Sequence, residues 1–299
     1  MSFKNIAEGI YYFDGAVNIG YVHKGTTGLL IDAGIDRSAV KKVIRYIEDN
    51  GMPLTHLFIS HAHADHYGGA AFVREKYEVE TWAPALESAI IENPVLEPLY
   101  LFGGNDPFPD VRNKFLEGPP VTIDIVVEEG TVHIGDIEAE VTILPGHSYR
   151  QATLTIDGVL FAADAYFGTE YLHKHRIPYI TDASIQIDTL RKLLNVDAKG
   201  AIPGHGTYEE DYSSTVEKNI EYHEKLLTWV KSFIQENGEV SHEELVSAMC
   251  TAYEVEVTKI PAWLLYRTAV TAYVNGLIRE GIVRSFLKDY KLTFALSTD

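Results

Sequence analysis

The first third of the chain alternates short apolar runs with glycine, a pattern that predicts sheet strands joined by tight turns. The runs span residues 9–15, 18–25 and 28–34. Residues 36–51 follow with helical periodicity, with Asp36 placed to cap the helix and Gly51 placed to end it. The apolar positions that share one face of this helix are Val40, Val43, Ile44 and Ile47. Strands followed by a helix in this way favour an α/β fold.

Further apolar runs predict more strands and two more helices. The strand runs span residues 54–60, 121–130, 131–135, 138–146, 152–158 and 159–164. One helix begins within residues 68–77, behind the histidine cluster, and the other spans 184–195. Residues 84–120 break the pattern, because they are rich in proline and glycine but carry large apolar side chains between 99 and 115. A long apolar loop of this kind either packs as part of the core or folds over a functional site as a lid.

From about residue 213 the periodicity becomes helical. Helices are predicted at 214–238, 241–253 and 262–281, and residues 282–296 have the pattern of two strands joined by a turn. Helices followed by a terminal hairpin predict a small, winged-helix-like domain at residues 213–299. The larger α/β domain would then occupy residues 1–212.

Composition narrows the class of protein. With 46% apolar residues in a chain of 299, a large core can be buried. Cys250 is the single cysteine, which excludes an internal disulfide framework and a thiolate-rich metal site. The first residues lack the basic and apolar segments of a secretory signal, and no apolar stretch approaches the roughly 20 residues of a transmembrane helix. We therefore expect a cytoplasmic protein with no membrane contact.

The formal net charge of −18 disfavours nucleic acid as a partner, because a polyanion repels phosphate backbones unless basic residues gather on one face. Residues 213–299 show no such face, with 9 Lys and Arg against 12 Asp and Glu. The apolar helix at 262–281 instead predicts packing against the larger domain or against a second copy in a homodimer. We expect His223 and His242, in the same region, to lie on solvated helix faces.

The candidate chemistry begins directly after the apolar run 54–60, where three of the 12 histidines fall within six positions. His61 and His63, two positions apart, can leave one side of an extended segment and bind one ion. Asp65 and His66 follow where the chain turns into a helix, so they point elsewhere and suit a second ion. Further candidates follow other apolar runs, where strands end and sites are commonly built. These are His147, Asp164 and His205.

The pattern HxHxDH at 61–66, GHS at 146–148, Asp164 and GHG at 204–206 resembles the metallo-β-lactamase superfamily over residues 8–212. The resemblance implies a four-layer αβ/βα sandwich with the site along one edge of the paired sheets. It implies that His61, His63 and His147 bind one metal, that Asp65, His66 and His205 bind the other, and that Asp164 bridges them. Asp32 corresponds to the family's early aspartate, which supports the ligands from behind.

Imidazole and carboxylate ligands suit two divalent ions, with Zn²⁺ preferred and Fe²⁺ or Mn²⁺ as alternatives. Two such ions can share a bridging hydroxide that attacks a carbonyl, and Asp65 would orient it or accept a proton. We expect a hydrolase of a small ester-like molecule, such as a thioester or lactone, by resemblance to the glyoxalase II-like branch. The alternatives are a mono-iron persulfide dioxygenase, a metal-dependent ribonuclease or phosphodiesterase, and a nucleic-acid-binding regulator.

Two short segments are candidates for substrate binding. Tyr149 and Arg150 follow the GHS motif as "GHSYRQ", which departs from the family pattern, and we expect them to contact the substrate. His175 and Arg176 belong to the most basic run of an acidic chain. A solvated loop is the preferred interpretation of that run, and a binding site for an anionic group of the substrate is the alternative.

Overall fold

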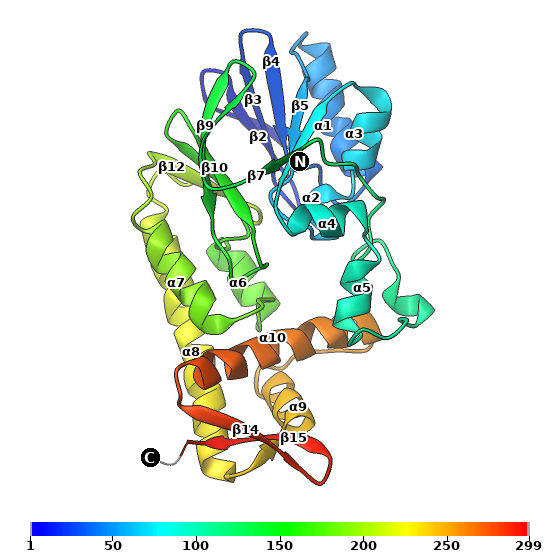
Figure 1. The fold of residues 1–299 in the computed structure, drawn as a ribbon. Helices are drawn as coiled ribbons and strands as arrows, with labels where there is room; N and C mark the ends of the chain where they lie inside the picture. The colour runs from blue at the N-terminus through cyan, green and yellow to red at the C-terminus, as the bar shows by residue number, and fades with distance from the viewer. Residues whose placement is uncertain (1, 298–299) are drawn as a thin grey trace. The chain divides into compact units, whose positions relative to one another are not determined.

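The computed structural model describes residues 2–297, and their contacts divide the chain into two compact units (Figure 1). The first unit contains the residues up to Leu144 together with Ser148–Gly168 and Asp197–Tyr212. The second contains Pro145–His147, Thr169–Val196 and the residues from Ser213 onward. A segment that the sequence placed in the larger domain therefore packs with the C-terminal helices, and a single domain boundary near 212 stays a prediction.

A seven-stranded sheet, in the order β1-β2-β3-β4-β5-β6-β7, forms one layer of the first unit. Its strands are β1 (Ser2–Ala7), β2 (Ile10–Asp14), β3 (Ile19–Lys24), β4 (Thr27–Ile31), β5 (His56–Phe58), β6 (Glu80–Pro84) and β7 (Ile125–Val127). Neighbouring strands are antiparallel from β1 to β4 and parallel from β4 to β7. The sequence did not predict β1.

A five-stranded sheet, in the order β12-β11-β10-β9-β8, forms a second layer. Its strands are β8 (Gly130–Ile134), β9 (Ile137–Ile143), β10 (Ala152–Ile156), β11 (Val159–Ala163) and β12 (Gly200–Pro203). Only β11 and β12 pair in parallel, since the other neighbours are antiparallel. The two sheets pack face to face over a shared core that includes Leu29, Phe58, Leu154 and Phe161.

Helices cover the other face of the seven-stranded sheet. α1 (Arg37–Asp49) and α3 (Ala70–Lys76) contribute Val43 and Val73 to the core that this face forms. As the sequence predicted, the Asp36 side chain caps α1 by accepting hydrogen bonds from two backbone N–H groups. The predicted α/β sandwich is confirmed, and the structure shows that both of its sheets are mixed.

The segment that the sequence left without regular structure contains short helices. They are α4 (Glu87–Glu92), α5 (Leu96–Leu101) and the 3₁₀ turn η1 (Pro109–Val111). Each is too short for a periodic apolar pattern to reveal it. Two of them bury an acidic residue, Glu87 on α4 and Glu97 on α5.

The second unit is helical with one small sheet. Its helices are α6 (Thr169–His175), α7 (Ala183–Leu193), α8 (Ser213–Asn237), α9 (His242–Ala252) and α10 (Ile260–Arg279). Its strands, β13 (Val240–Ser241), β14 (Val283–Lys288) and β15 (Lys291–Leu296), form a sheet in the order β13-β15-β14. The terminal hairpin is present as predicted, and assignment to the winged-helix class stays a prediction.

The expectation that His223 and His242 lie on solvated faces is wrong. His223 is fully buried and its Nδ1 lies 2.8 Å from the Tyr273 hydroxyl, within the core of α8 and α10. His242 is also buried, with Nε2 2.7 Å from the Thr271 hydroxyl. Polar partners on another helix allow imidazoles to be buried where the sequence suggests solvent. Between residues 2 and 297, none of the helices combines the length and the apolar content needed to cross a bilayer.

Candidate metal centre

The histidine cluster lies where the buried strand β5 ends. Residues 59–63 connect β5 to the short helix α2 (Ala64–Tyr67). His63 has extended backbone, with φ −78° and ψ 137°, and stands at the N-cap of α2, whereas Asp65 lies in its first turn. His63 therefore leaves extended backbone, and Asp65 and His66 leave a helix.

Asp164 and His205 follow two strands that run in parallel. Asp164 comes directly after β11, and His205 comes two residues after β12. Asp32 directly follows β4, which pairs in parallel with β5 in the other sheet. Because parallel strands end at the same edge of a sheet, this topology gathers residues from four separate stretches of the chain at one place.

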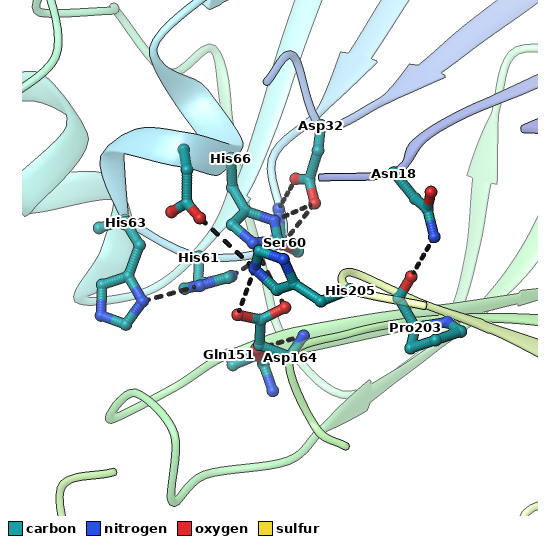
Figure 2. A network of polar contacts seen from close by, with 12 residues as sticks. Asn18, Asp32, Ser60, His61, His63, His66, Gln151, Asp164, Pro203 and His205 are labelled. Carbon is teal, nitrogen blue, oxygen red and sulfur yellow. Dashed lines mark hydrogen bonds and ion pairs between the residues drawn. The ribbon is translucent and has the colours of Figure 1, made fainter. Parts of the chain in front are cut away.

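Within the first unit these side chains converge (Figure 2). His205 Nε2 lies 3.4 Å from a carboxylate oxygen of Asp65 and 3.4 Å from one of Asp164. His66 Nε2 lies 3.4 Å from the other oxygen of Asp164. Two groups of three side chains could each hold a metal ion, because their nitrogen and oxygen atoms lie within 4.8 Å of one another. One group is His61, His66 and Asp164. The other is Asp65, His66 and His205.

Asp32 fixes the orientation of the cluster through hydrogen bonds to Ser60 and a contact with His66. Its carboxylate accepts hydrogen bonds from the Ser60 N–H at 2.8 Å and the Ser60 hydroxyl at 2.9 Å, and one oxygen lies 2.7 Å from His66 Nδ1. Because Ser60 donates its hydroxyl hydrogen to Asp32, its oxygen accepts from His61 Nδ1 at 2.9 Å. Both imidazoles therefore carry a proton on Nδ1 and have the lone pair on Nε2.

His205 is oriented in the same way by a backbone carbonyl. Its Nδ1 donates to the Ala16 oxygen at 2.8 Å, so Nε2 bears the lone pair that faces Asp65 and Asp164. The buried Nε2 of His66 has no hydrogen-bond partner among the described residues. Nitrogen and carboxylate lone pairs at this distance repel unless a proton or a cation lies between them. This donor set of imidazoles and carboxylates fits a divalent metal ion.

The carboxylates of Asp164, Asp65 and Asp32 make positive charge favourable in the site. Burial lowers the pKa of His205, but Asp164 and Asp65 outweigh burial and raise that pKa to about 10. Burial likewise opposes charge on His66, whose pKa Asp164 and Asp32 still raise well above its usual value. The site therefore favours positive charge beside Asp164, which is the charge that a dication supplies.

Glu87 holds the loops that carry the candidate ligands, and the sequence did not predict this role. This carboxylate, on α4, is 2% exposed and accepts the Ala62 N–H at 2.9 Å, the Ser148 hydroxyl at 2.7 Å and the Arg150 N–H at 2.9 Å. It therefore ties the HxHxDH loop to the last residue of the GHS motif and to Arg150 beyond it. Nothing in the local pattern around Glu87 signals these long-range contacts.

Asn18 and Gln151 were also missed. Asn18 Nδ2 donates to the carbonyls of Pro203 and Gly206 at 2.8 and 2.7 Å, which fixes the loop that carries His205. Gln151 Oε1 accepts the Asp164 N–H at 3.0 Å. The requirement for glycine within the GHG motif also becomes clear, since a Cβ on Gly204 would lie 2.1 Å from an Asp164 carboxylate oxygen.

His147 belongs to the second unit. Its Nδ1 donates to the Tyr179 carbonyl at 2.9 Å, which makes Nε2 the lone-pair nitrogen, as in His61, His66 and His205. Its role as a metal ligand stays a prediction.

The four candidate substrate residues differ in what they contact. Tyr149 is 73% exposed, and Arg150 pairs with Glu128 at 2.5 Å. Arg176 donates from Nη1 to the carbonyls of Tyr253 and Glu254 at 2.9 and 2.6 Å, so its guanidinium is engaged within the second unit. His175 is the last residue of α6.

Comparison with curated proteins finds relatives that this chain resembles in part. A hydroxyacylglutathione hydrolase of Rhodopseudomonas palustris strain BisB5 is 30% identical over 154 residues, which are 50% of this chain and 48% of that protein. A hydroxyacylglutathione hydrolase of Bradyrhizobium sp. strain ORS 278 is 26% identical over 179 residues, 58% of each chain. The chain thus spans about half the length of the curated relatives it matches.

Solved structures share the fold over nearly the whole chain. A β-lactamase domain protein of Burkholderia ambifaria matches with a TM-score of 0.75 at 17% identity, covering 99% of this chain and 93% of the other. A metallo-β-lactamase family protein of Thermus thermophilus matches with a TM-score of 0.75 at 16% identity, covering 97% and 99%. The family model of the metallo-β-lactamase superfamily matches residues 12–205. This chain therefore belongs to the metallo-β-lactamase superfamily.

Proposed function

We propose that this protein is a dinuclear metal-dependent hydrolase that acts on a small ester-like molecule such as a thioester or a lactone. The observation that carries the proposal is the position of Asp164. One of its oxygens lies 3.4 Å from His66 Nε2 and the other 3.4 Å from His205 Nε2, and it also falls in one ligand group with His61. A carboxylate so placed can serve two ions.

The full ligand set extends this arrangement. We assign His61, His63 and His147 to one ion, Asp65, His66 and His205 to the other, and Asp164 to both. The Nδ1 hydrogen bonds of His61, His66, His147 and His205 support this assignment, because each turns the same ring nitrogen into the ligand atom. Zn²⁺ suits these ligands best, and Fe²⁺ or Mn²⁺ would accept them too.

Divalent ions held there supply an acidified water and neutralise charge that develops on a carbonyl oxygen. Asp65 would orient that water. Burial disfavours charge on Asp65, but His205 and His66 outweigh burial and hold the pKa of this carboxyl well below its usual range. Its side chain keeps 35% of its surface exposed, more than those of His205 or Asp164, so it can meet solvent and substrate.

The substrate class rests on the named relatives. Two of them are called hydroxyacylglutathione hydrolases, a name that denotes cleavage of an acyl group from glutathione. An acyl thioester is therefore the first substrate to test. Tyr149, Arg150 and His175 are the side chains we propose as substrate contacts, and the engagement of Arg176 with the α9–α10 connection makes it the weakest of the four candidates.

A substrate panel tests this function. The wild-type protein is incubated with a small acyl thioester, a lactone, a phosphodiester and a persulfide, and hydrolysis and oxygen consumption are followed. We expect hydrolysis of the thioester or the lactone, no oxygen consumption, and a loss of roughly 10²–10⁴-fold in kcat in Asp65→Asn. Asp188→Asn, an exposed aspartate on α7, is the matched control and should retain full activity. Oxygen consumption with the persulfide, or cleavage of the phosphodiester alone, would contradict the proposal.

A further inference from the structure

The buried carboxylate of Glu87 binds two loops of the candidate metal centre, one with each oxygen. Its Oε2 accepts the Ala62 N–H at 2.9 Å. Its Oε1 accepts the Ser148 hydroxyl at 2.7 Å and the Arg150 N–H at 2.9 Å. Because all three partners donate, a carboxylate satisfies them and an amide cannot, since its NH₂ group would face a donor.

The groups that this carboxylate holds are neighbours of candidate ligands. Ala62 is the residue between His61 and His63. Ser148 directly follows His147. Hydrogen bonds to a buried, charged acceptor are shorter and stronger than those between neutral groups, so they fix the backbone on either side of them. The carboxylate is therefore placed to set the positions of these ligands without contacting a metal ion.

The backbone that leads to Glu87 is strained. Leu86, directly before it, has φ 70° and ψ −51°, a conformation that is unfavourable for a residue with a Cβ. Strain of this kind persists only where the surrounding contacts impose it, and it gathers at functional sites. The three hydrogen bonds of Glu87 are contacts that impose it here. The start of α4 is thus fixed in the conformation that brings the carboxylate to the two loops.

Other groups support the remaining candidate ligands. Asp32 lies 2.7 Å from His66 Nδ1. Asn18 donates to the carbonyls of Pro203 and Gly206, on either side of His205. The centre therefore has separate supports, with one set behind His66 and His205 and Glu87 behind the loops of the other histidines.

We propose that Glu87 is a positioning residue that sets the affinity for one of the two ions, namely the ion assigned to His61, His63 and His147. The affinity for the other ion does not depend on it. This role rests on the proposed function, which assigns the ligands to the two ions. Glu87 acts through the backbone and hydroxyl groups that it fixes and is not itself a ligand.

Selectivity between the ions separates this role from plain support of the fold. A residue that only stabilised the fold would, when replaced, shift the folding equilibrium on which binding of both ions depends, and both affinities would fall together. A residue that positions one loop pair changes the ligand geometry of one ion alone.

Two variants separate the ions for the test. His205→Ala removes a ligand of one ion and His63→Ala removes a ligand of the other, so each background retains a single ion. Competition with a chelator of known affinity then measures the affinity of each metal-free protein for Zn²⁺. In the His205→Ala background, we expect Glu87→Gln to weaken Zn²⁺ binding by roughly 10–100-fold. In the His63→Ala background, we expect Glu87→Gln to change the affinity less than about threefold.

Three further variants complete the design. Ser148→Ala removes one donor and keeps the carboxylate, and it should weaken Zn²⁺ binding in the His205→Ala background by roughly 2–10-fold. Asn18→Ala is the reciprocal variant and should weaken only the ion that remains in the His63→Ala background. Glu75→Gln, at an exposed position of α3, is the control and should change neither affinity.

Equal losses for Glu87→Gln in both backgrounds, or a loss in neither, would overturn the role of Glu87 and leave the ligand assignment intact. If Glu87→Gln does not fold, Ser148→Ala decides, and an unchanged affinity in the His205→Ala background would overturn the role. A single ion in the wild-type protein would overturn the ligand assignment of the proposed function, and the role of Glu87 would fall with it.

Discussion

At the scale of single residues, hydrogen bonds to Nδ1 of each histidine decide which ring nitrogen is available to bind a metal ion. Asp32, Ser60 and the Ala16 carbonyl each engage an Nδ1 and so turn an Nε2 toward the carboxylates. Groups behind metal ligands fix the ring orientation and the position of the proton, and their loss typically costs roughly 10–100-fold in metal affinity. Asp32 contributes most to this orientation of the histidines, because it accepts hydrogen bonds from Ser60 and also contacts His66.

We therefore expect Asp32→Asn to weaken metal binding by roughly 10–100-fold while the protein remains folded. The amide has almost the same volume as the carboxylate, but it brings a donor NH₂ group and removes the charge beside His66. Competition with a chelator of known affinity measures the change, and Asp188→Asn serves as the control. Unchanged affinity in Asp32→Asn would show that Asp32 does not orient a ligand.

At the scale of elements, the sequence predicted the strand ends well because each combines two strong signals. An apolar run followed by a histidine or an aspartate marks a buried strand that delivers a polar side chain to an edge, as at Asp164 and His205. Glu87 and Asn18 could not be found in this way. Their roles consist of contacts with residues more than 20 positions away, and the short helix that carries Glu87 has no periodicity of its own.

The helices of the second unit show the same limit. His223 was expected in solvent, yet it is buried beside Tyr273 on a helix 50 positions away in the sequence. Helical periodicity shows which positions share a face, but it does not show what that face contacts. The hairpin that ends the chain was predicted because both strands and the turn between them are local in sequence.

The burial of His223 leads to a pH-dependent stability. Burial, aided by His147, lowers the pKa of His223 to about 3, so the folded protein keeps this imidazole neutral while the unfolded chain protonates it near pH 6.5. Its contribution is complete above pH 6.5 and is lost as the pH falls toward 3. Between about pH 6.5 and 5, wild type should lose roughly 1.5 kcal/mol more of its free energy of unfolding than His223→Gln.

Urea unfolding of the two proteins at both pH values measures this difference. Glu236→Gln, at an exposed position of the same helix, provides a control that should lose as much stability as wild type. Parallel losses in wild type and His223→Gln would show that His223 titrates in the folded protein and is not buried as described.

At the scale of the whole molecule, the chain divides into two units, and the proposed ligand set draws on both. Six of the proposed ligands belong to the first unit and His147 belongs to the second. The sequence proposes all seven because the motif around each is local, but it did not predict that residues 145–147 and 169–196 pack with the C-terminal helices. That division depends on long-range contacts that no local pattern records.

The central claim is that two metal ions serve one site, and metal stoichiometry tests it most directly. Native mass spectrometry and elemental analysis of the purified wild-type protein would give the number and identity of bound ions per chain. We predict two divalent ions, most of them zinc, and one fewer in His147→Ala, with the fold retained. A single iron per chain, or two ions undiminished in His147→Ala, would contradict the account.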